Sequence, residues 1–251
     1  MKEYRDCYVA FLDILGFKNM INNKPCGELF EIFESIKASS HTGVRLNDED
    51  METFKHIEYT IMSDSVVVYI DANLDDALFA LLCTCQTIQM ELLNKGILMR
   101  GGIARGTLFR EEYVIFGKGL SNAYLLESNI ASFPRIVFNR ELLDDGNEHN
   151  VGIPQGAWHY MLTAQDDDEL YYINSVALPR VIAFVDGQEK VPDYFETALT
   201  TCQKVLDSAY DNSIRQKYLW LKNKIIKELQ KNRGIFIDQC KGGFLLEKWG
   251  L

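Results

Sequence analysis

The chain has 251 residues, of which 47 % are hydrophobic and 25 % charged, so we expect a globular protein and exclude global disorder and fibrous structure. Its 26 basic and 36 acidic residues give a net charge of −10, which argues against a nucleic-acid partner because duplex binding needs a positive field. A nucleotide substrate is still compatible with this charge, since divalent metal ions can supply the positive charge.

Cellular location is also constrained by the sequence. No apolar stretch is long enough to cross a membrane, and charges of both signs follow Met1 where a signal peptide needs an apolar core. None of the six cysteines forms a CxxC pair. We therefore expect a cytoplasmic protein without a membrane segment, whose cysteines are buried and reduced.

Apolar runs and their spacing predict a mixed set of elements. In chain order, we expect strands at 7–14, 54–61, 66–70, 97–104, 113–116, 135–138 and 170–173. We expect helices at 28–38, 74–95, 121–127, 195–210 and 214–229, and a polar loop at 41–52. The order β-α-β-β-α-β, followed by a further α-β, is the split βαβ pattern of ferredoxin-like folds. The predicted fold class is therefore α+β, ferredoxin-like (βαββαβ), with a C-terminal helical extension.

The character of the chain changes after Pro192. The last 60 or so residues are mainly two amphipathic helices with a short connection, and a segment of that size has little core of its own. We expect one domain over residues 1–192 and a helical extension over 193–251 that packs on it and is not an independent domain.

The first predicted strand ends in FLDILGF, residues 11–17. An aspartate at the end of a buried strand, before a tight glycine turn, can hold a hard cation, and the following amides can line a phosphate-binding concavity. Asp13 could equally cap the next turn or helix, and the segment alone does not decide between these uses.

The predicted hairpin has the tip Met62-Ser63-Asp64-Ser65. An aspartate at such a tip is usually a turn former. Two strongly apolar strands fix the position of Asp64, however, and a hairpin beside the first strand brings it towards Asp13. Two close carboxylates repel unless a proton or a metal lies between them, and a pair of Mg²⁺ or Mn²⁺ ions keeps both ionised.

Two glycine-containing segments complete the pattern. The strand segment MRGGIARG, residues 99–106, carries the adjacent glycines Gly101 and Gly102, which indicate a bulge or the close approach of a ligand, and Arg100 is a candidate phosphate contact. One RGG in an apolar strand does not make an RNA-binding RGG domain. The segment FGKGLSNAYLLE, residues 116–127, predicts a glycine turn entering a helix; it lacks the spacing of a Walker loop.

In this order, FLDILGF, SDS, RGGIARG and GKGLSNAYLLE resemble the class III nucleotide cyclases over residues 5–140. The family pattern is F-x-D-I-x-G-F at a strand end, [GS]-D at a hairpin tip, R-x-G-I-x-x-G on a strand and G-x-x-[LV]-N-x-A-x-x-L-E on a helix. The compact chain, the SDS tip and the RGGIA strand look most like the pyrimidine cyclases of bacterial Pycsar antiphage systems. Such enzymes make cyclic UMP or cyclic CMP, which activates a separate effector.

The resemblance implies roles for individual residues. Two ions, Mn²⁺ or Mg²⁺, are bridged by Asp13 and Asp64, with the carbonyl of Ile14 as a further ligand. The implied triphosphate ligands are the backbone amides of Leu15, Gly16 and Phe17 and the side chain of Arg100. The metals activate the ribose 3′-hydroxyl for attack on the α-phosphate, and pyrophosphate leaves.

The chain departs from the family at the catalytic helix. The transition-state asparagine of the family aligns with Ser121, and Asn122 follows one place later as the candidate catalytic residue. The family arginine four positions beyond aligns with Leu125, so this helix does not supply the usual asparagine and arginine pair.

The base-reading positions differ too. Thr60 stands where adenylate cyclases have a lysine, and the position of its aspartate partner falls near Val114. Neither residue can read adenine in the usual way, so Tyr59 and Thr60 are the candidates for lining a smaller base pocket.

The predicted function is a homodimeric, metal-dependent phosphorus–oxygen lyase that converts UTP, or less favourably CTP, to the 3′,5′-cyclic monophosphate and pyrophosphate, as a second-messenger synthase in antiviral defence. The dimer follows from the resemblance, and the 74–95 helix and the C-terminal hairpin are available to form its interface. Two alternatives are a purine (adenylate or guanylate) cyclase with an unusual pocket and a catalytically silent, nucleotide-binding cyclase-homology domain. A silent relative need not keep two mutually repelling carboxylates.

Overall fold

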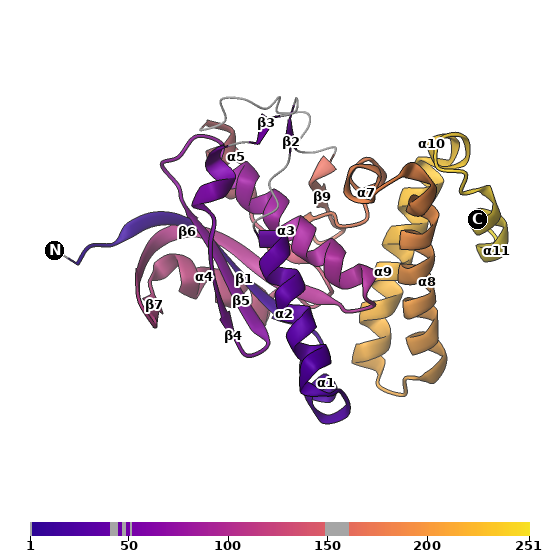
Figure 1. Cartoon of the computed structure of the whole chain (residues 1–251), viewed down its shortest axis with the longest axis horizontal. Coiled ribbons are helices and arrows are strands. Elements are labelled where there is room, and N and C mark those ends of the chain that lie inside the picture. The colour runs from indigo at the N-terminus through magenta and orange to yellow at the C-terminus, as the bar shows by residue number, and fades with distance from the viewer. Residues whose placement is uncertain (1, 41–44, 47–48, 51, 149–160) are drawn as a thin grey trace.

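The computed structural model describes residues 2–40, 45–46, 49–50, 52–148 and 161–251. Its centre is an eight-stranded sheet in the order β4-β5-β1-β6-β8-β10-β9, with β7 paired to β6 (Figure 1). The strands of this sheet are β1 (Arg5–Ile14), β4 (Glu58–Met62), β5 (Ser65–Asp71), β6 (Met99–Glu111), β7 (Val114–Phe116), β8 (Ile136–Phe138), β9 (Thr163–Gln165) and β10 (Tyr171–Ile173). A separate pair consists of β2 (Arg45–Leu46) and β3 (Glu49–Asp50).

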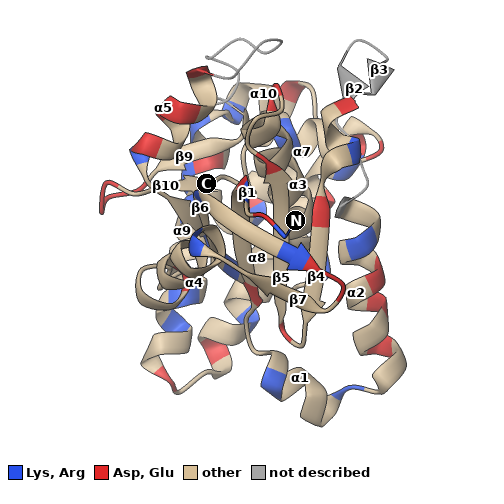
Figure 2. Cartoon of the chain, turned by 90° about the vertical axis from the view of Figure 1, so that its left-hand side faces the viewer, with Lys and Arg blue, Asp and Glu red and all other residues tan. Residues whose placement is uncertain are grey.

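Helices cover the sheet and extend from one end of it. They are α1 (Phe17–Asn23), α2 (Cys26–Ser40), α3 (Ala77–Asn94), α4 (Lys118–Asn129), α5 (Arg140–Glu148), α7 (Leu178–Phe184), α8 (Val191–Ser208), α9 (Asn212–Lys231), α10 (Arg233–Asp238) and α11 (Gly243–Trp249), with short 3₁₀ turns η1 (Glu52–His56) and η2 (Gln188–Lys190). Acidic and basic residues are interspersed along α2, and α5 carries mostly acidic ones (Figure 2).

The strand order confirms the predicted α+β class and its ferredoxin-like core. β1 lies between β5 and β6 and is antiparallel to both, while β4 pairs with β5. Helices α1 and α2 connect β1 to the β4–β5 hairpin, and α3 connects that hairpin to β6. The expected strand at 54–61 begins only at Glu58, because Phe54 lies in the 3₁₀ turn η1.

The two faces of the sheet carry different layers. Alternate residues of β1, such as Leu12, join a core cluster with α2 and α3, whereas Val9 and Phe11 join a smaller cluster with α4. Nearly every residue of α3 is buried, because α2 packs over it. The 74–95 helix, expected to be available for a dimer interface, is therefore not available, since it has no free face within this chain.

The C-terminal helices share an apolar cluster with the rest of the chain. Phe195 and Leu199 of α8 and Ile225 of α9 pack in one buried cluster with Met90 and Leu98. The predicted helical hairpin is confirmed: Asp211 caps α9 by accepting hydrogen bonds from the amides of Ser213 and Ile214. The proposed domain boundary at residues 192 and 193 falls in the first turn of α8 and stays a prediction.

Two further expectations can be compared with the structure. All six cysteines are free thiols, and five are buried as expected, but Cys26 is exposed at the start of α2. No helix in the described part of the chain combines the length and the apolarity that a bilayer crossing requires.

Candidate active site

Asp13 and Asp64 meet at one end of the central strands. Asp13 stands opposite Ser65 of β5 and Arg100 of β6 in the sheet register. The hairpin turn between β4 and β5 consists of Ser63 and Asp64, and Ser63 adopts a positive φ of 58°. The next amide along β1, that of Ile14, donates a hydrogen bond of 2.9 Å to the carbonyl oxygen of Asp64. The tip of the hairpin is thus held against the end of β1.

Arg100 connects Asp13 to a third carboxylate. Its Nε lies 3.4 Å from Asp13 Oδ2, and its Nη2 lies 2.6 Å from Glu127 Oε1. Its Nη1 donates a hydrogen bond of 3.3 Å to the carbonyl oxygen of Ala131. The Glu127 side chain is only 4 % exposed, against 20 % for Asp13 and 25 % for Arg100. We call Asp13, Asp64, Arg100 and Glu127 the acid-rich cluster.

The glycines of β6 bring α4 onto the sheet and so place Glu127. A Cβ at Gly102 would collide with the carbonyl oxygen of Ala123, and one at Gly106 would lie 2.8 Å from the amide nitrogen of Gly119. The helix backbone therefore rests directly on the strand at two points four residues apart. Gly101 and Gly102 were expected to indicate a bulge or the close approach of a ligand; the structure shows instead that β1 approaches Gly101, where a Cβ would lie 2.6 Å from the carbonyl oxygen of Phe11, and that α4 approaches Gly102.

The acid-rich cluster contains more negative than positive charge. Burial raises the pKa of Asp13, and the negative charge of Asp64 adds to this shift. The positive charges of the neighbouring Arg100 and of Lys217 oppose it. Burial also raises the pKa of Glu127; Arg100 opposes the shift, while Asp13 and Asp64 increase it. Glu127 Oε1 is buried without a partner in hydrogen-bonding geometry, although Arg100 lies in ion-pair range. Asp13 and Glu127 thus share one guanidinium, Asp64 adds a third negative charge nearby, and a further cation would relieve their repulsion.

The donor chemistry of Asp13 and Asp64 fits a hard divalent cation. Carboxylate and carbonyl oxygens are the ligands that Mg²⁺ and Mn²⁺ prefer, and Mg²⁺ is usually held by one or two carboxylates together with substrate phosphates. In the described ranges no group of three or more His, Cys, Asp or Glu side chains converges as a complete metal site. The two aspartates therefore fit a cation whose remaining ligands come from a bound phosphate and water.

The loop after β1 is only partly available to a ligand. The amide of Leu15 donates a hydrogen bond of 2.9 Å to the carbonyl oxygen of Leu98, so this amide is already paired within the chain and its implied phosphate contact stays a prediction. The amides of Gly16 and Phe17 have no acceptor among the described residues. Gly16 has a φ of 77° and borders a cavity of about 1030 Å³.

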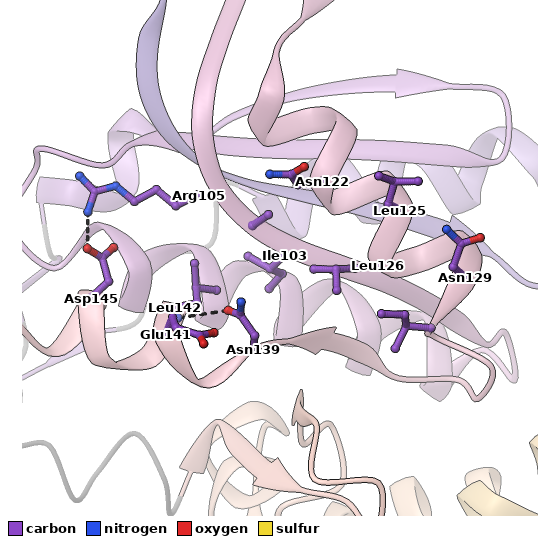
Figure 3. A pocket seen from close by; sticks show the side chains of 12 residues that line it. Ile103, Arg105, Asn122, Leu125, Leu126, Asn129, Asn139, Glu141, Leu142 and Asp145 are labelled. Carbon is purple, nitrogen blue, oxygen red and sulfur yellow. Dashed lines mark hydrogen bonds and ion pairs between the residues drawn. The ribbon is translucent and has the colours of Figure 1, made fainter.

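Asn122 does not belong to the acid-rich cluster of its own chain. It is exposed on α4 and lines a different cavity of about 640 Å³, together with Leu125 of α4 and Asn139 beside α5 (Figure 3). Ser121 is exposed as well, and Leu125 is 49 % exposed. The buried face of the same helix carries Glu127 instead.

The two base-binding candidates lie on opposite faces of the sheet. Tyr59 packs against the core cluster under α2 and α3, while Thr60 pairs with Val67, whose side chain faces α4. Adjacent residues of a strand point to opposite sides, so only Thr60 shares the face of Asp13. The Oγ1 atom of Thr60 is buried without a hydrogen-bond partner in the part of the chain that the structure describes.

Sequence reasoning gave no role to Glu127 or to Lys217. Glu127 is the last letter of the GKGLSNAYLLE segment, and its spacing of four from the buried Ala123 was a usable signal that it faces the sheet. Lys217 lies more than 200 residues from Asp13 in the chain, and no local pattern connects the two.

Comparison with known proteins adds one finding. No family model and no curated protein matches the chain. Among solved structures, the catalytic core of a rhodopsin-guanylyl cyclase with converted specificity, in complex with ATPαS, is similar at a TM-score of 0.45 and 13 % sequence identity, over 69 % of this chain and 97 % of that one.

Proposed function

We propose that the chain is a nucleotide cyclase that converts UTP or CTP to the 3′,5′-cyclic monophosphate and pyrophosphate. The observation that carries this proposal is the pair Asp13 and Asp64 at the end of the central strands, next to Arg100 and a glycine turn. The order of the four sequence segments that resemble class III cyclases supports the same function.

The reaction needs one bond to form and one to break. The ribose 3′-hydroxyl loses its proton to solvent, and its oxygen attacks the α-phosphorus. The bond from that phosphorus to the oxygen bridging to the β-phosphate then breaks, and pyrophosphate leaves. Mn²⁺ or Mg²⁺, two ions per site, held by Asp13, Asp64 and the Ile14 carbonyl, would lower the pKa of the hydroxyl and neutralise phosphate charge.

Other residues of the chain orient the substrate. Arg100 is held between Asp13 and Glu127, and a guanidinium so fixed can donate charge-assisted hydrogen bonds to phosphate oxygens. The amides of Gly16 and Phe17 are further donors for the triphosphate. Glu127 acts as a positioning residue for Arg100.

We assign base recognition to Thr60 and the transition-state contact to Asn122. Thr60 has an unpaired buried hydroxyl on the face of Asp13, and a short polar side chain suits a pyrimidine. Asn122 is exposed on α4, so it can serve the site of a second copy of the chain. A homodimer with shared sites accounts for the position of Asn122 outside the acid-rich cluster of its own chain.

The cyclic product is proposed to act as a second messenger that activates a separate effector in antiviral defence. This part depends on the resemblance to Pycsar cyclases alone. A gene for a membrane or TIR-type effector with a cyclic-nucleotide-binding domain beside the gene for this chain would support it, and cyclic UMP or cyclic CMP should bind that effector.

The experiment is incubation with each of the four nucleoside triphosphates and Mn²⁺, followed by chromatography of the nucleotides and measurement of pyrophosphate. We expect UTP or CTP to give the cyclic monophosphate and pyrophosphate in equal amounts, at least tenfold faster than ATP or GTP. Equal turnover of ATP and UTP would contradict the pyrimidine assignment and would indicate a cyclase that also accepts purine nucleotides. Nucleotide binding without product after long incubation would instead indicate the silent cyclase-homology domain.

A further inference from the structure

A cavity of about 1030 Å³ lies between the loop after β1 and the C-terminal helical hairpin. Gly16 and Asn19 line it on one side, the turn at Lys95 and Gly96 lines it on another, and Lys204 of α8 and Lys217 of α9 close it. Figure 1 shows the connected ends of α8 and α9 on the same side of the molecule as α1. The cavity thus lies between the loop after β1 and a part of the chain outside the ferredoxin-like core.

The hairpin is anchored on the loop. Leu15, which follows directly after β1, packs against the apolar cluster that includes α8 and α9. Val205, Ile214 and Tyr218 of the hairpin line the same cavity. Because α8 and α9 are fixed by a buried cluster, the lysines on them are presented to the cavity from a rigid support.

The charge of the cavity is opposite to that of the whole chain. Its lining has four lysines and two glutamates, in a chain with a net charge of −10. Lys24 forms an ion pair of 2.9 Å with Glu28. Lys95, Lys204 and Lys217 have no carboxylate partner among the described residues. Three ammonium groups without counter-ions around one cavity favour an anion, and a polyanion can meet all three.

The loop after β1 connects the cavity to the acid-rich cluster. Leu15 and Gly16 line the cavity, and they follow Asp13 by two and three residues. Asp13 and Gly16 are three residues apart, so a triphosphate whose α-phosphate lies at Asp13 can extend its tail past Gly16 into the cavity.

We propose that Lys217, with Lys95 and Lys204, binds the β- and γ-phosphates of the substrate and the departing pyrophosphate, so that the C-terminal hairpin forms part of the substrate site. This assignment rests on the proposed cyclase function for the identity of the substrate. Polyphosphate binding by the hairpin can be measured by itself, in the absence of catalytic turnover.

The test is isothermal titration calorimetry of pyrophosphate with the full-length unmodified chain and with Lys217→Gln, Lys217→Arg and the double variant Lys95→Gln/Lys204→Gln. Lys227→Gln is the matched control, because Lys227 is also on α9 but lines a different cavity. A lost charged hydrogen bond weakens binding by about tenfold or more, so we expect the dissociation constant of pyrophosphate to rise by that factor in Lys217→Gln. Lys217→Arg should restore most of the affinity and Lys227→Gln should leave it unchanged.

Competition separates the substrate from an independent anionic effector. We expect UTP or CTP to displace pyrophosphate, and cyclic UMP, which has no polyphosphate tail, to displace it poorly. Pyrophosphate and triphosphate bound independently would contradict the substrate assignment. Unchanged pyrophosphate affinity in both folded variants, Lys217→Gln and Lys95→Gln/Lys204→Gln, would overturn the site altogether.

The two proposals can fail separately. If the chain cyclises UTP and Lys217→Gln behaves like the unmodified protein in binding and in KM, the lysine site is wrong and the cyclase function stands. If no triphosphate is cyclised but Lys217→Gln still loses affinity for pyrophosphate, the polyphosphate site stands and the cyclase function falls.

Discussion

The molecule contains two clusters of charged side chains that differ in their balance. In the balanced cluster, Arg135 contacts Asp166 at 2.6 Å and also pairs with Asp168, while Lys224 pairs with Asp166. Two cations meet two carboxylates there. In the acid-rich cluster, Asp13 and Glu127 share Arg100, and Asp64 brings a third negative charge close to them.

The pKa shifts of the two clusters have opposite signs. Burial acts against ionised Asp166, but hydrogen bonds from Lys224, the Asp167 backbone and Trp220 outweigh it and lower the pKa of that carboxyl. A hydrogen bond from Arg135 lowers the pKa of Asp168, although burial opposes it. The pKa values of Asp13 and Glu127 are raised instead. The balanced cluster therefore stabilises the fold, whereas the acid-rich cluster keeps a deficit of positive charge that a bound cation can fill.

Removal of either aspartate of the acid-rich cluster should have the largest effect on activity. Asp13→Asn and Asp64→Asn are expected to lower cyclase turnover by about three decades or more, because metal-based stabilisation contributes several kcal/mol to the barrier. Turnover with Mn²⁺ measures the effect, and circular dichroism checks the fold. Asp75→Asn, an exposed aspartate beyond the far end of β5, is the control. Near-normal turnover in either folded cluster variant would contradict the metal role.

Removal of the central cation of the balanced cluster should instead destabilise the fold. Arg135 is 1 % exposed, and Arg135→Gln leaves two carboxylates with one fewer partner. We expect a loss of about 3–5 kcal/mol in the free energy of unfolding, measured by urea titration. Arg140→Gln removes an exposed ion pair with Asp144 and should cost less than about 1 kcal/mol. Equal losses in the two variants would show that the balanced cluster is not a stabilising feature.

A smaller effect is expected at the base position. Thr60→Val keeps the shape of the side chain and removes the hydroxyl that we assign to the base. Loss of one buried hydrogen bond to the base corresponds to about 1–3 kcal/mol, so the preference for pyrimidine over ATP in kcat/KM should fall by about 5- to 150-fold. Tyr59→Phe, on the opposite face, should keep the preference. A preference that survives Thr60→Val would move base recognition to another residue.

The smallest expected effect is the pH dependence of stability, which should have opposite signs in the two clusters. The raised pKa of Asp13 means that the folded state holds its proton longer than the unfolded state does. This carboxyl therefore destabilises the fold as the pH rises through and above the usual aspartate range. The lowered pKa of Asp166 means that its stabilising contribution is present at neutral pH and disappears as the pH falls below about 4.

Urea unfolding between about pH 2 and pH 8 measures this difference, because the change at Asp166 falls below about pH 4 and the change at Asp13 above it. Asp13→Asn should gain stability over the unmodified protein as the pH rises, and Asp166→Asn should lose stability over the same range. Parallel curves for the two variants would mean that the clusters do not differ in the way described.

Much of the fold was predictable from the sequence because it depends on local apolar patterns. The strand at 7–14, the hairpin around Asp64 and the helical hairpin after Pro192 all carry strong periodicity, and each is present. Helix α1 was not predicted, since FKNMINN has a weak apolar pattern and buries only Phe17. Short elements such as β9 depend on pairing with β10, a tertiary contact that local sequence does not encode.

The candidate site was predictable only in part. The proximity of Asp13 and Asp64 followed from strand order, but the bridge from Arg100 to Glu127 depends on how closely α4 approaches Gly102 and Gly106. Strand alternation alone could have separated Tyr59 from Thr60, because Tyr59 and Ile61 are the apolar positions of β4. The sequence-based prediction placed Tyr59 and Thr60 in one base pocket, although strand alternation puts their side chains on opposite faces of the sheet.

Calorimetric titration of Mn²⁺ tests the central claim, that the acid-rich cluster is a divalent cation site, most directly. We expect saturable binding by the unmodified protein that strengthens when UTP is present, because phosphate oxygens complete the ligand set. Binding should disappear in Asp13→Asn and Asp64→Asn and persist in Asp75→Asn and Asp168→Asn. Mn²⁺ affinity that is the same in the folded Asp64→Asn variant as in the unmodified protein, with and without UTP, would contradict this claim.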